Sequence, residues 1–183
     1  SNRFIDLRIY MSTSQSKQWK PLLFTASIVL IDQIVKLIIT SLIKLNTIAV
    51  SWLCDFLWIT HQRNSGGAFS FADSASPIIR ILIFILIPLA VLALLAWSIL
   101  FSKEYKPLER WMLAGIIGGG LGNIVDRIFR PQGVVDFISI KFYGLFGFER
   151  WPTFNIADSC IVVCGIILCC SLIFSNKNNR ETE

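Results

Sequence analysis

Charged residues are scarce in this chain. They account for 16% of its 183 residues, whereas a soluble domain usually carries about 25%. The few charges fall between four long apolar runs, at about residues 22–43, 78–101, 111–129 and 154–174. A helix needs about 20 mostly apolar residues to cross a membrane. The composition therefore argues against a soluble globular domain and predicts a polytopic α-helical membrane protein with four transmembrane helices in one domain.

Histidine is nearly absent, and cysteine is rare outside the apolar runs. A zinc site needs three or four ligands, and no cluster around the single histidine, His61, supplies them. Four of the five cysteines lie in the last apolar run, where we expect small apolar side chains rather than disulfides. No basic run accompanies the net charge of +5. This argues against nucleic-acid binding and fits contact with anionic membrane phospholipids.

The basic residues favour one orientation of the four spans. Lysine and arginine occur in the N-terminal lead, in the short turn between the second and third runs, and in the C-terminal tail. By the positive-inside rule, both termini then lie in the cytoplasm. We expect a cytoplasmic N-terminal segment at 1–20, a membrane domain at 21–175 and a cytoplasmic tail at 176–183. Met11 is a candidate native start, so residues 1–10 carry no functional weight.

The first long connection between the spans lies on the opposite, outer side. Residues 47–60 are rich in β-branched and aromatic side chains, which predicts short strands. We expect a small extracytoplasmic sheet that rests on the membrane surface through aromatic anchors, namely Trp52, Trp58, Phe69 and Phe71.

The third apolar run contains five glycines. Gly115 with Gly119, and Gly118 with Gly122, have the small-xxx-small spacing that lets two helices approach closely. We therefore expect this helix to pack tightly against its neighbours.

Several charged and amide side chains are expected at membrane depth, where a charge costs several kcal/mol unless it has a partner or a function. Asp32 and Lys36 are four residues apart on one helix face, which predicts a mutual ion pair. The outer end of the third span carries Asn123 and Asp126. The same Asn-x-x-Asp spacing recurs at the outer start of the fourth span, as Asn155 and Asp158, and Asp136 follows Asp126 after only ten residues.

Three carboxylates and two amides therefore converge on one membrane boundary. Two close carboxylates share a proton, so that one acts as a base and the other as an acid. Such a pair can activate water for peptide hydrolysis, but the cluster could equally bind a cation or relay protons in a transporter. A third interpretation is that the carboxylates only pair with Arg127, Arg130 or Lys36. Composition and spacing leave these interpretations open.

Five stretches together resemble the bacterial lipoprotein signal peptidases, the signal peptidase II family. They are DQIVK at 32–36, RNSGGAFS at 63–70, GGGLGNIVDR at 118–127, VVDF at 134–137 and FNIAD at 154–158. The resemblance implies four transmembrane helices with a small extracytoplasmic β-cradle. It also implies an aspartyl endopeptidase that removes the signal peptide of prolipoproteins before a diacylglyceryl-modified cysteine. The catalytic pair of the family corresponds to Asp136 and Asp158.

The resemblance also implies supporting roles, position by position. Asn64 and Gly66 would contact the substrate, while Asn123, Arg127 and Asn155 would position the substrate and the two aspartates. The residues that would stabilise the site are Asp32, Lys36 and Asp126. No cofactor or metal is implied. The expected location is the bacterial inner membrane, with the site at the outer face, a monomeric enzyme and sensitivity to globomycin.

Overall fold

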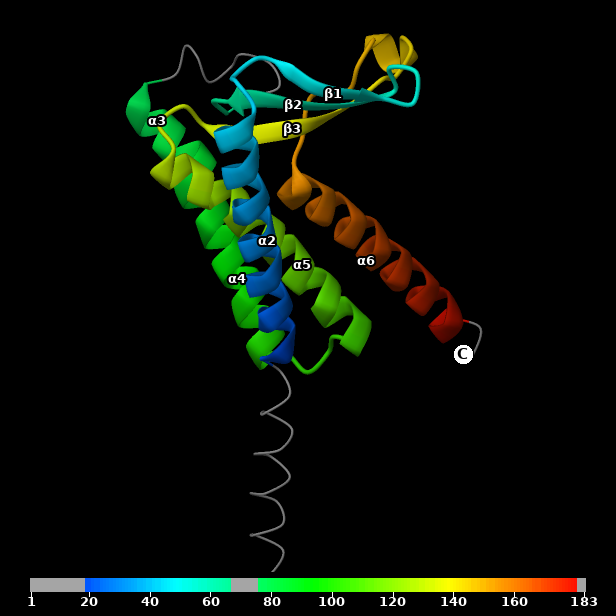
Figure 1. Ribbon diagram of the computed structural model, residues 1–183. Helices are drawn as coiled ribbons and strands as arrows, with labels where there is room; N and C mark the ends of the chain where they lie inside the picture. The colour runs from blue at the N-terminus through cyan, green and yellow to red at the C-terminus, as the bar shows by residue number, and fades with distance from the viewer. Residues whose placement is uncertain (1–18, 67–75, 181–183) are drawn as a thin grey trace, which may run out of the picture.

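Four long apolar helices form a bundle, and a small sheet lies across one end of it. The computed structural model describes residues 19–66 and 76–180. The helices are α2 (Lys20–Leu42), the continuous helix Pro77–Phe101, α5 (Pro107–Phe129) and α6 (Ile156–Arg180). Both ends of the described chain lie at the end of the bundle away from the sheet (Figure 1). The expected anchors Phe69 and Phe71, and Gly67–Ser70 of the second motif, lie outside the described residues.

Each of the first three spans has a proline in its first turn. Pro21, Pro77 and Pro107 occupy the first turns of their helices, where the missing N–H of proline costs no hydrogen bond. The helix Pro77–Phe101 consists of α3 (Pro77–Ile81), a π-helical turn η1 (Leu82–Leu86) and α4 (Ile87–Phe101). The π turn ends two residues before Pro88, which cannot donate the ordinary helical hydrogen bond to the preceding turn.

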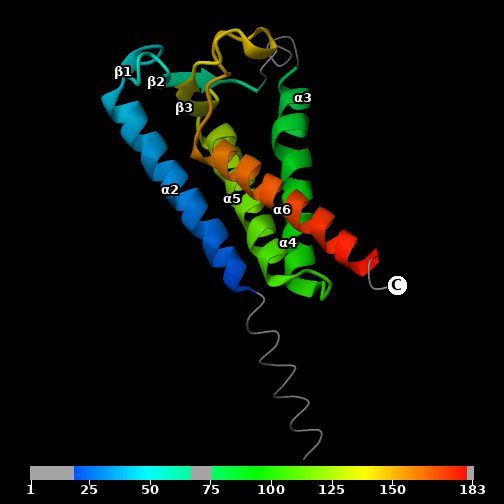
Figure 2. The ribbon, with the colours of Figure 1, turned by 90° about the vertical axis from the view of Figure 1, so that its right-hand side faces the viewer.

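Helix α5 is the central helix of the bundle (Figures 1 and 2). In its apolar stretch 56% of the residues are buried, whereas the share in the helix Pro77–Phe101 is 6%. Glycine allows this packing: a Cβ at Gly119 would collide with the carbonyl oxygen of Ala157, and one at Gly118 would lie 3.0 Å from Cβ of Ile28. A Cβ at Gly120 would lie 2.7 Å from Leu92. The glycines thus bring α6, α2 and α4 against three sides of one helix.

The sheet is antiparallel, with the order β1 (Ile48–Trp52), β2 (Leu57–Asn64) and β3 (Val134–Ile140). The first two strands fall in the region where the sequence predicted strands. The third comes from the connection between α5 and α6, so β2 pairs with a segment about 70 residues away. Strand β3 is buried along most of its length, because it lies between β2 and the ends of the helices.

The two tryptophans expected as membrane anchors differ in the structure. Trp52 is 65% exposed, as an anchor requires. Trp58 is half-buried: its indole N–H donates to Oγ of Ser51 at 3.1 Å and to Asp55, and the guanidinium of Arg150 lies 3.5 Å from its ring centre. Trp58 therefore holds the sheet to the loop that carries Arg150.

Candidate active site

The site begins at the first turn of α6, which is closed by a reciprocal capping box. The backbone N–H of Asp158 donates to Oδ1 of Asn155 at 2.9 Å, and the backbone N–H of Asn155 donates to Oδ2 of Asp158 at 3.1 Å. The Asn-x-x-Asp spacing here is thus the signature of a helix start. It places the carboxylate of Asp158 at the partially positive end of α6, which stabilises negative charge.

Asp136 lies in the middle of β3 and is 3% exposed. Its Oδ2 accepts a hydrogen bond from Nδ2 of Asn64 at 3.1 Å, and its Oδ1 accepts one from Nδ2 of Asn155 at 2.8 Å. Asn64 pairs with Val134 in the sheet, two residues from Asp136, so the two side chains share one face of the sheet. Burial, and after it the charge of Asp158, raises the pKa of Asp136 to about 7.

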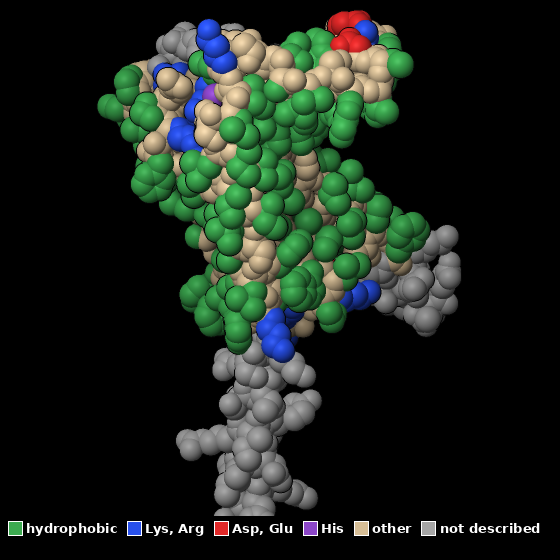
Figure 3. Space-filling view, viewed as in Figure 1, with side chains coloured by type: hydrophobic (Ala, Val, Ile, Leu, Met, Phe, Trp, Pro, Cys, Tyr) green, Lys and Arg blue, Asp and Glu red, His purple; other side chains and the backbone are tan. Residues whose placement is uncertain are grey.

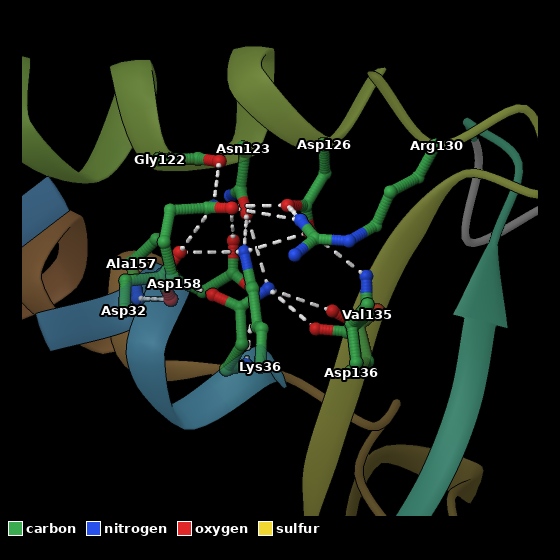
Figure 4. Close-up of polar contacts among 12 residues, drawn as sticks. Asp32, Lys36, Gly122, Asn123, Asp126, Arg130, Val135, Asp136, Ala157 and Asp158 are labelled. Carbon is green, nitrogen blue, oxygen red and sulfur yellow. Dashed lines mark hydrogen bonds and ion pairs between the residues drawn. The ribbon is translucent and has the colours of Figure 1, made fainter. Parts of the chain in front are cut away.

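Asn155 joins the two aspartates. Its side-chain amide donates to Asp136, while its backbone N–H donates to Asp158. Asn123 on α5 completes the connection: its Nδ2 donates to Oδ1 of Asp158 at 2.7 Å, and its Oδ1 accepts from Asn155 at 3.1 Å and from Nζ of Lys36 at 3.1 Å. Hydrogen bonds through Asn123 and Asn155 therefore connect the carboxyl groups of Asp136 on β3 and Asp158 on α6. Figure 4 shows Asn123 together with both aspartates.

A fully buried ion cluster lies next to the two aspartates. Lys36 pairs with Asp32 at 2.7 Å, as the sequence predicted, and also with Asp126 at 3.0 Å. Each carboxylate also holds a backbone N–H: Asp32 accepts from Ala157 at 3.1 Å, and Asp126 accepts from Val135 at 3.0 Å. Ala157 precedes Asp158, and Val135 precedes Asp136. The cluster thus anchors the chain one residue before each aspartate (Figure 4).

Gln33, which had no role in the sequence prediction, and Arg130, which the sequence offered as a possible carboxylate partner, complete this cluster. Nε2 of Gln33 donates to Oδ1 of Asp126 at 2.9 Å and to the carbonyl oxygen of Gly122 at 3.0 Å. Arg130 pairs with Asp126 and donates to Oε1 of Gln33 at 2.8 Å. Gln33 stands inside the DQIVK motif and Arg130 follows Asp126 by one helical turn, but only the fold reveals that the two side chains meet.

The remaining predicted site residues lie around the aspartates. The backbone N–H of Gly66 donates to Oδ1 of Asn64 at 3.1 Å, and its φ of +126° is a conformation that favours glycine. The guanidinium of Arg127 interacts electrostatically with Asp158 and Asp136. Every residue predicted for the site therefore lies in or beside one network at the sheet end of the bundle.

A polar cavity of about 230 Å³ gives access to this network. Asp136 forms part of its wall, although the residue is largely buried. The other residues that line the cavity are Gln62, Arg63, Asn64, Ser65, Pro152 and Thr153.

Comparisons with known proteins agree with one another. The family model described as "Signal peptidase (SPase) II" matches residues 24–174. A lipoprotein signal peptidase of Treponema pallidum is 43% identical over 163 residues, which cover 89% of this chain and 88% of that protein. One from Borreliella burgdorferi is 39% identical over 158 residues, with 86% and 91% covered.

Solved structures give the same result for the fold. A bacterial membrane enzyme determined by the in meso method at 2.3 Å resolution superposes with a TM-score of 0.73 at 28% identity, over 89% of this chain and 93% of that one. A second such structure, at 1.9 Å resolution, gives a TM-score of 0.70 at 29% identity, with 83% and 91% covered.

Proposed function

The chain belongs to the signal peptidase II family, and on that premise we propose that it is an aspartyl endopeptidase of prolipoproteins. It cleaves the signal peptide immediately before the diacylglyceryl-modified cysteine, with Asp136 and Asp158 as the catalytic pair. The family supports a protease that removes signal peptides from lipoproteins. The catalytic pair and the cleavage position are the proposed steps beyond it.

The position of Asn155 carries this proposal. Its side chain binds one aspartate and its backbone binds the other, so the two carboxyl groups are held close together and in different environments. Asp136 is buried on a strand, and its pKa of about 7 lets it keep a proton near neutral pH. Asp158 lies in the first turn of α6, where its carboxylate accepts hydrogen bonds from the backbone N–H of Asn155 and from Nδ2 of Asn123. Metal-free peptide hydrolysis requires a protonated carboxyl group as the acid next to an ionised one as the base.

The mechanism follows from this asymmetry. Ionised Asp158 takes a proton from a water molecule, whose oxygen attacks the carbonyl carbon of the scissile bond, while protonated Asp136 donates a hydrogen bond to the carbonyl oxygen. The tetrahedral intermediate collapses when Asp158 passes its proton to the leaving nitrogen. The products are a signal peptide with a new carboxyl terminus and a lipoprotein whose modified cysteine has a free amino group.

The surrounding residues have two roles in this proposal. Asn64 and Gly66 border the aspartates and contact the substrate, while Asn123, Arg127 and Asn155 position the substrate and the two carboxyl groups. The ion cluster that stabilises the site consists of Asp32, Lys36 and Asp126.

The substrate and the membrane fit the exposed surfaces. The diacylglyceryl chains remain in lipid, and the polar cavity beside Asp136 receives the peptide next to the scissile bond. We place the protein in the bacterial inner membrane as a monomer, with both termini in the cytoplasm and the sheet on the outer face.

The test is cleavage of a diacylglyceryl-prolipoprotein peptide, followed as a gel shift and blocked by globomycin. Asp136→Asn and Asp158→Asn should each abolish cleavage while the purified protein keeps its helical circular dichroism. Asp55→Asn is the matched control, because Asp55 lies in the β1–β2 turn away from the network. Near-normal turnover in either dyad variant would refute the assignment. Ion flux in proteoliposomes without hydrolysis would instead favour a transporter.

A further inference from the structure

A second cavity, of about 220 Å³, lies between the first turns of the helix Pro77–Phe101 and the outer end of α5. One part of its wall is apolar and comes from Ile81, Phe84 and Ile85, and the other part carries three arginines, Arg80, Arg127 and Arg130. None of the described residues that line it is acidic. A cavity that combines guanidinium groups with an apolar wall suits an amphiphilic anion.

The electrostatics around this cavity favour an anion. Within the described residues, Nε of Arg127 is buried without a hydrogen-bond partner, and its guanidinium lies 5.6 Å from the ring centre of Phe84. Burial, and after it the charge of Arg130, lowers the pKa of the nearby Arg63. Positive charge is therefore crowded here, although Asp126 pairs with Arg130.

The distribution of charged side chains on the surface points the same way. On the face in Figure 3, lysine and arginine side chains gather near α3 and the end of α5, while the acidic side chains lie at the far tip of the sheet.

The position of the cavity indicates the source of the anion. It opens at the end of the membrane-spanning helices, where phospholipid headgroups lie, and the helix surface beside it is apolar and exposed. Ile78 is 78% exposed and Ile81 is 49% exposed. An acyl chain can lie along this surface while a phosphate lies in the cavity, because guanidinium groups bind phosphate oxygens in bidentate geometry.

We propose that this cavity binds the headgroup of an anionic phospholipid such as phosphatidylglycerol, with Arg80 and Arg127 as donors to the phosphate and the acyl chains against Ile81 and Phe84. The site goes beyond the proposed hydrolysis: it holds a lipid that is not cleaved. Because Arg127 borders both this cavity and the aspartates, the bound lipid lies directly beside the catalytic pair.

The experiment measures lipid binding to the full chain in detergent micelles by native mass spectrometry. The probes are phosphatidylglycerol, phosphatidylcholine, diacylglycerol and inorganic phosphate. We expect phosphatidylglycerol to bind best. Diacylglycerol, which lacks the phosphate, and inorganic phosphate, which lacks the acyl chains, should bind weakly. Arg80→Gln should weaken phosphatidylglycerol binding roughly tenfold, as expected for a hydrogen bond between charged groups. Arg80→Lys, which keeps the charge, should recover part of this loss.

Lys44→Gln is the matched control, because Lys44 is exposed just beyond the end of α2 on the same side of the bundle and does not line the cavity. Equal losses in Arg80→Gln and Lys44→Gln would indicate only general surface attraction and would overturn the proposal. Binding of inorganic phosphate or of diacylglycerol as strong as that of phosphatidylglycerol would overturn it too. Competitive inhibition of cleavage by phosphatidylglycerol would also overturn it, because the cavity would then belong to the substrate. Asp136→Asn should bind phosphatidylglycerol normally, so this test stands or fails independently of the proposed hydrolysis.

Discussion

Replacing Asp136 with asparagine should reduce the pH dependence of the protein's stability between about pH 4 and pH 7. In the folded protein, burial and the charge of Asp158 raise the pKa of Asp136 from 3.8 to about 7. Over that interval the folded state holds a proton that the unfolded state has released. The free energy of unfolding therefore falls as the pH rises and levels off above the folded pKa.

The structure sets the size of the effect. A change in pKa from 3.8 to about 7 corresponds to roughly 4 kcal/mol in total. Asparagine cannot ionise, so Asp136→Asn loses this slope, and relative to the wild type it should gain stability as the pH rises. Its side-chain oxygen can still accept the hydrogen bond from Asn155.

The measurement is chemical or thermal unfolding in detergent micelles between about pH 4.5 and pH 8.5, which spans the interval where the two states differ in protonation. Asp55→Asn serves as the control. Asp55 is partly exposed, and hydrogen bonds, first from Trp58 and then from Lys141, lower its pKa, so it stays ionised over this range. That variant should keep the wild-type slope. The same slope in Asp136→Asn and in the wild type would refute the argument that Asp136 is a buried acid with a raised pKa.

Four further predictions follow from the same contacts. Cleavage should decline above about pH 7, because Asp136 then loses the proton that polarises the carbonyl; a rate that keeps rising to pH 9 would contradict this. Asn155→Ala should reduce kcat about 100-fold or more, as for the loss of one aligned donor, with helicity retained. Asp126→Ala should destabilise the protein by about 3–5 kcal/mol, because it removes one partner of the buried Lys36. Gly119→Ala should lower the free energy of unfolding by about 1–3 kcal/mol, because the added methyl group overpacks the helix contact. Gly165→Ala, with nothing within 4 Å of the added methyl group, should leave the free energy of unfolding unchanged or raise it. Unfolding of the last three variants, compared with the wild type, tests the stability claims.

The sequence predicts the parts of the fold that depend on local composition. Four apolar runs predict four helices, and β-branched residues near 47–60 predict strands. The third strand, Val134–Ile140, is not evident from its own residues, because a buried strand of this length resembles any short apolar run. Its pairing with β2 joins segments about 70 residues apart, and local pattern carries no information about that partner.

The two Asn-x-x-Asp pairs show the same limit within the site. Asn123 and Asp126 lie on one face inside α5, whereas Asn155 and Asp158 form the capping box that begins α6. The same Asn-x-x-Asp spacing therefore occurs in two different local structures, a helix interior and a capping box. The sequence alone brings both pairs to the same membrane boundary without distinguishing them, because the distinction depends on where α6 begins.

In the proposed mechanism the catalytic pair is Asp136 and Asp158, and the contacts of the three carboxylates are the physical reason for leaving Asp126 out. Asp126 is fully buried and accepts from Lys36, Arg130, Gln33 and the N–H of Val135. Two cationic partners and two neutral donors occupy its oxygens, which leaves little room for a water molecule to approach them. The side-chain donors to Asp136 are neutral amides, and Asp136 borders an open polar cavity. A carboxyl group can exchange a proton during catalysis only if its partners do not fix its charge, and by that criterion Asp126 belongs to the framework that holds the pair.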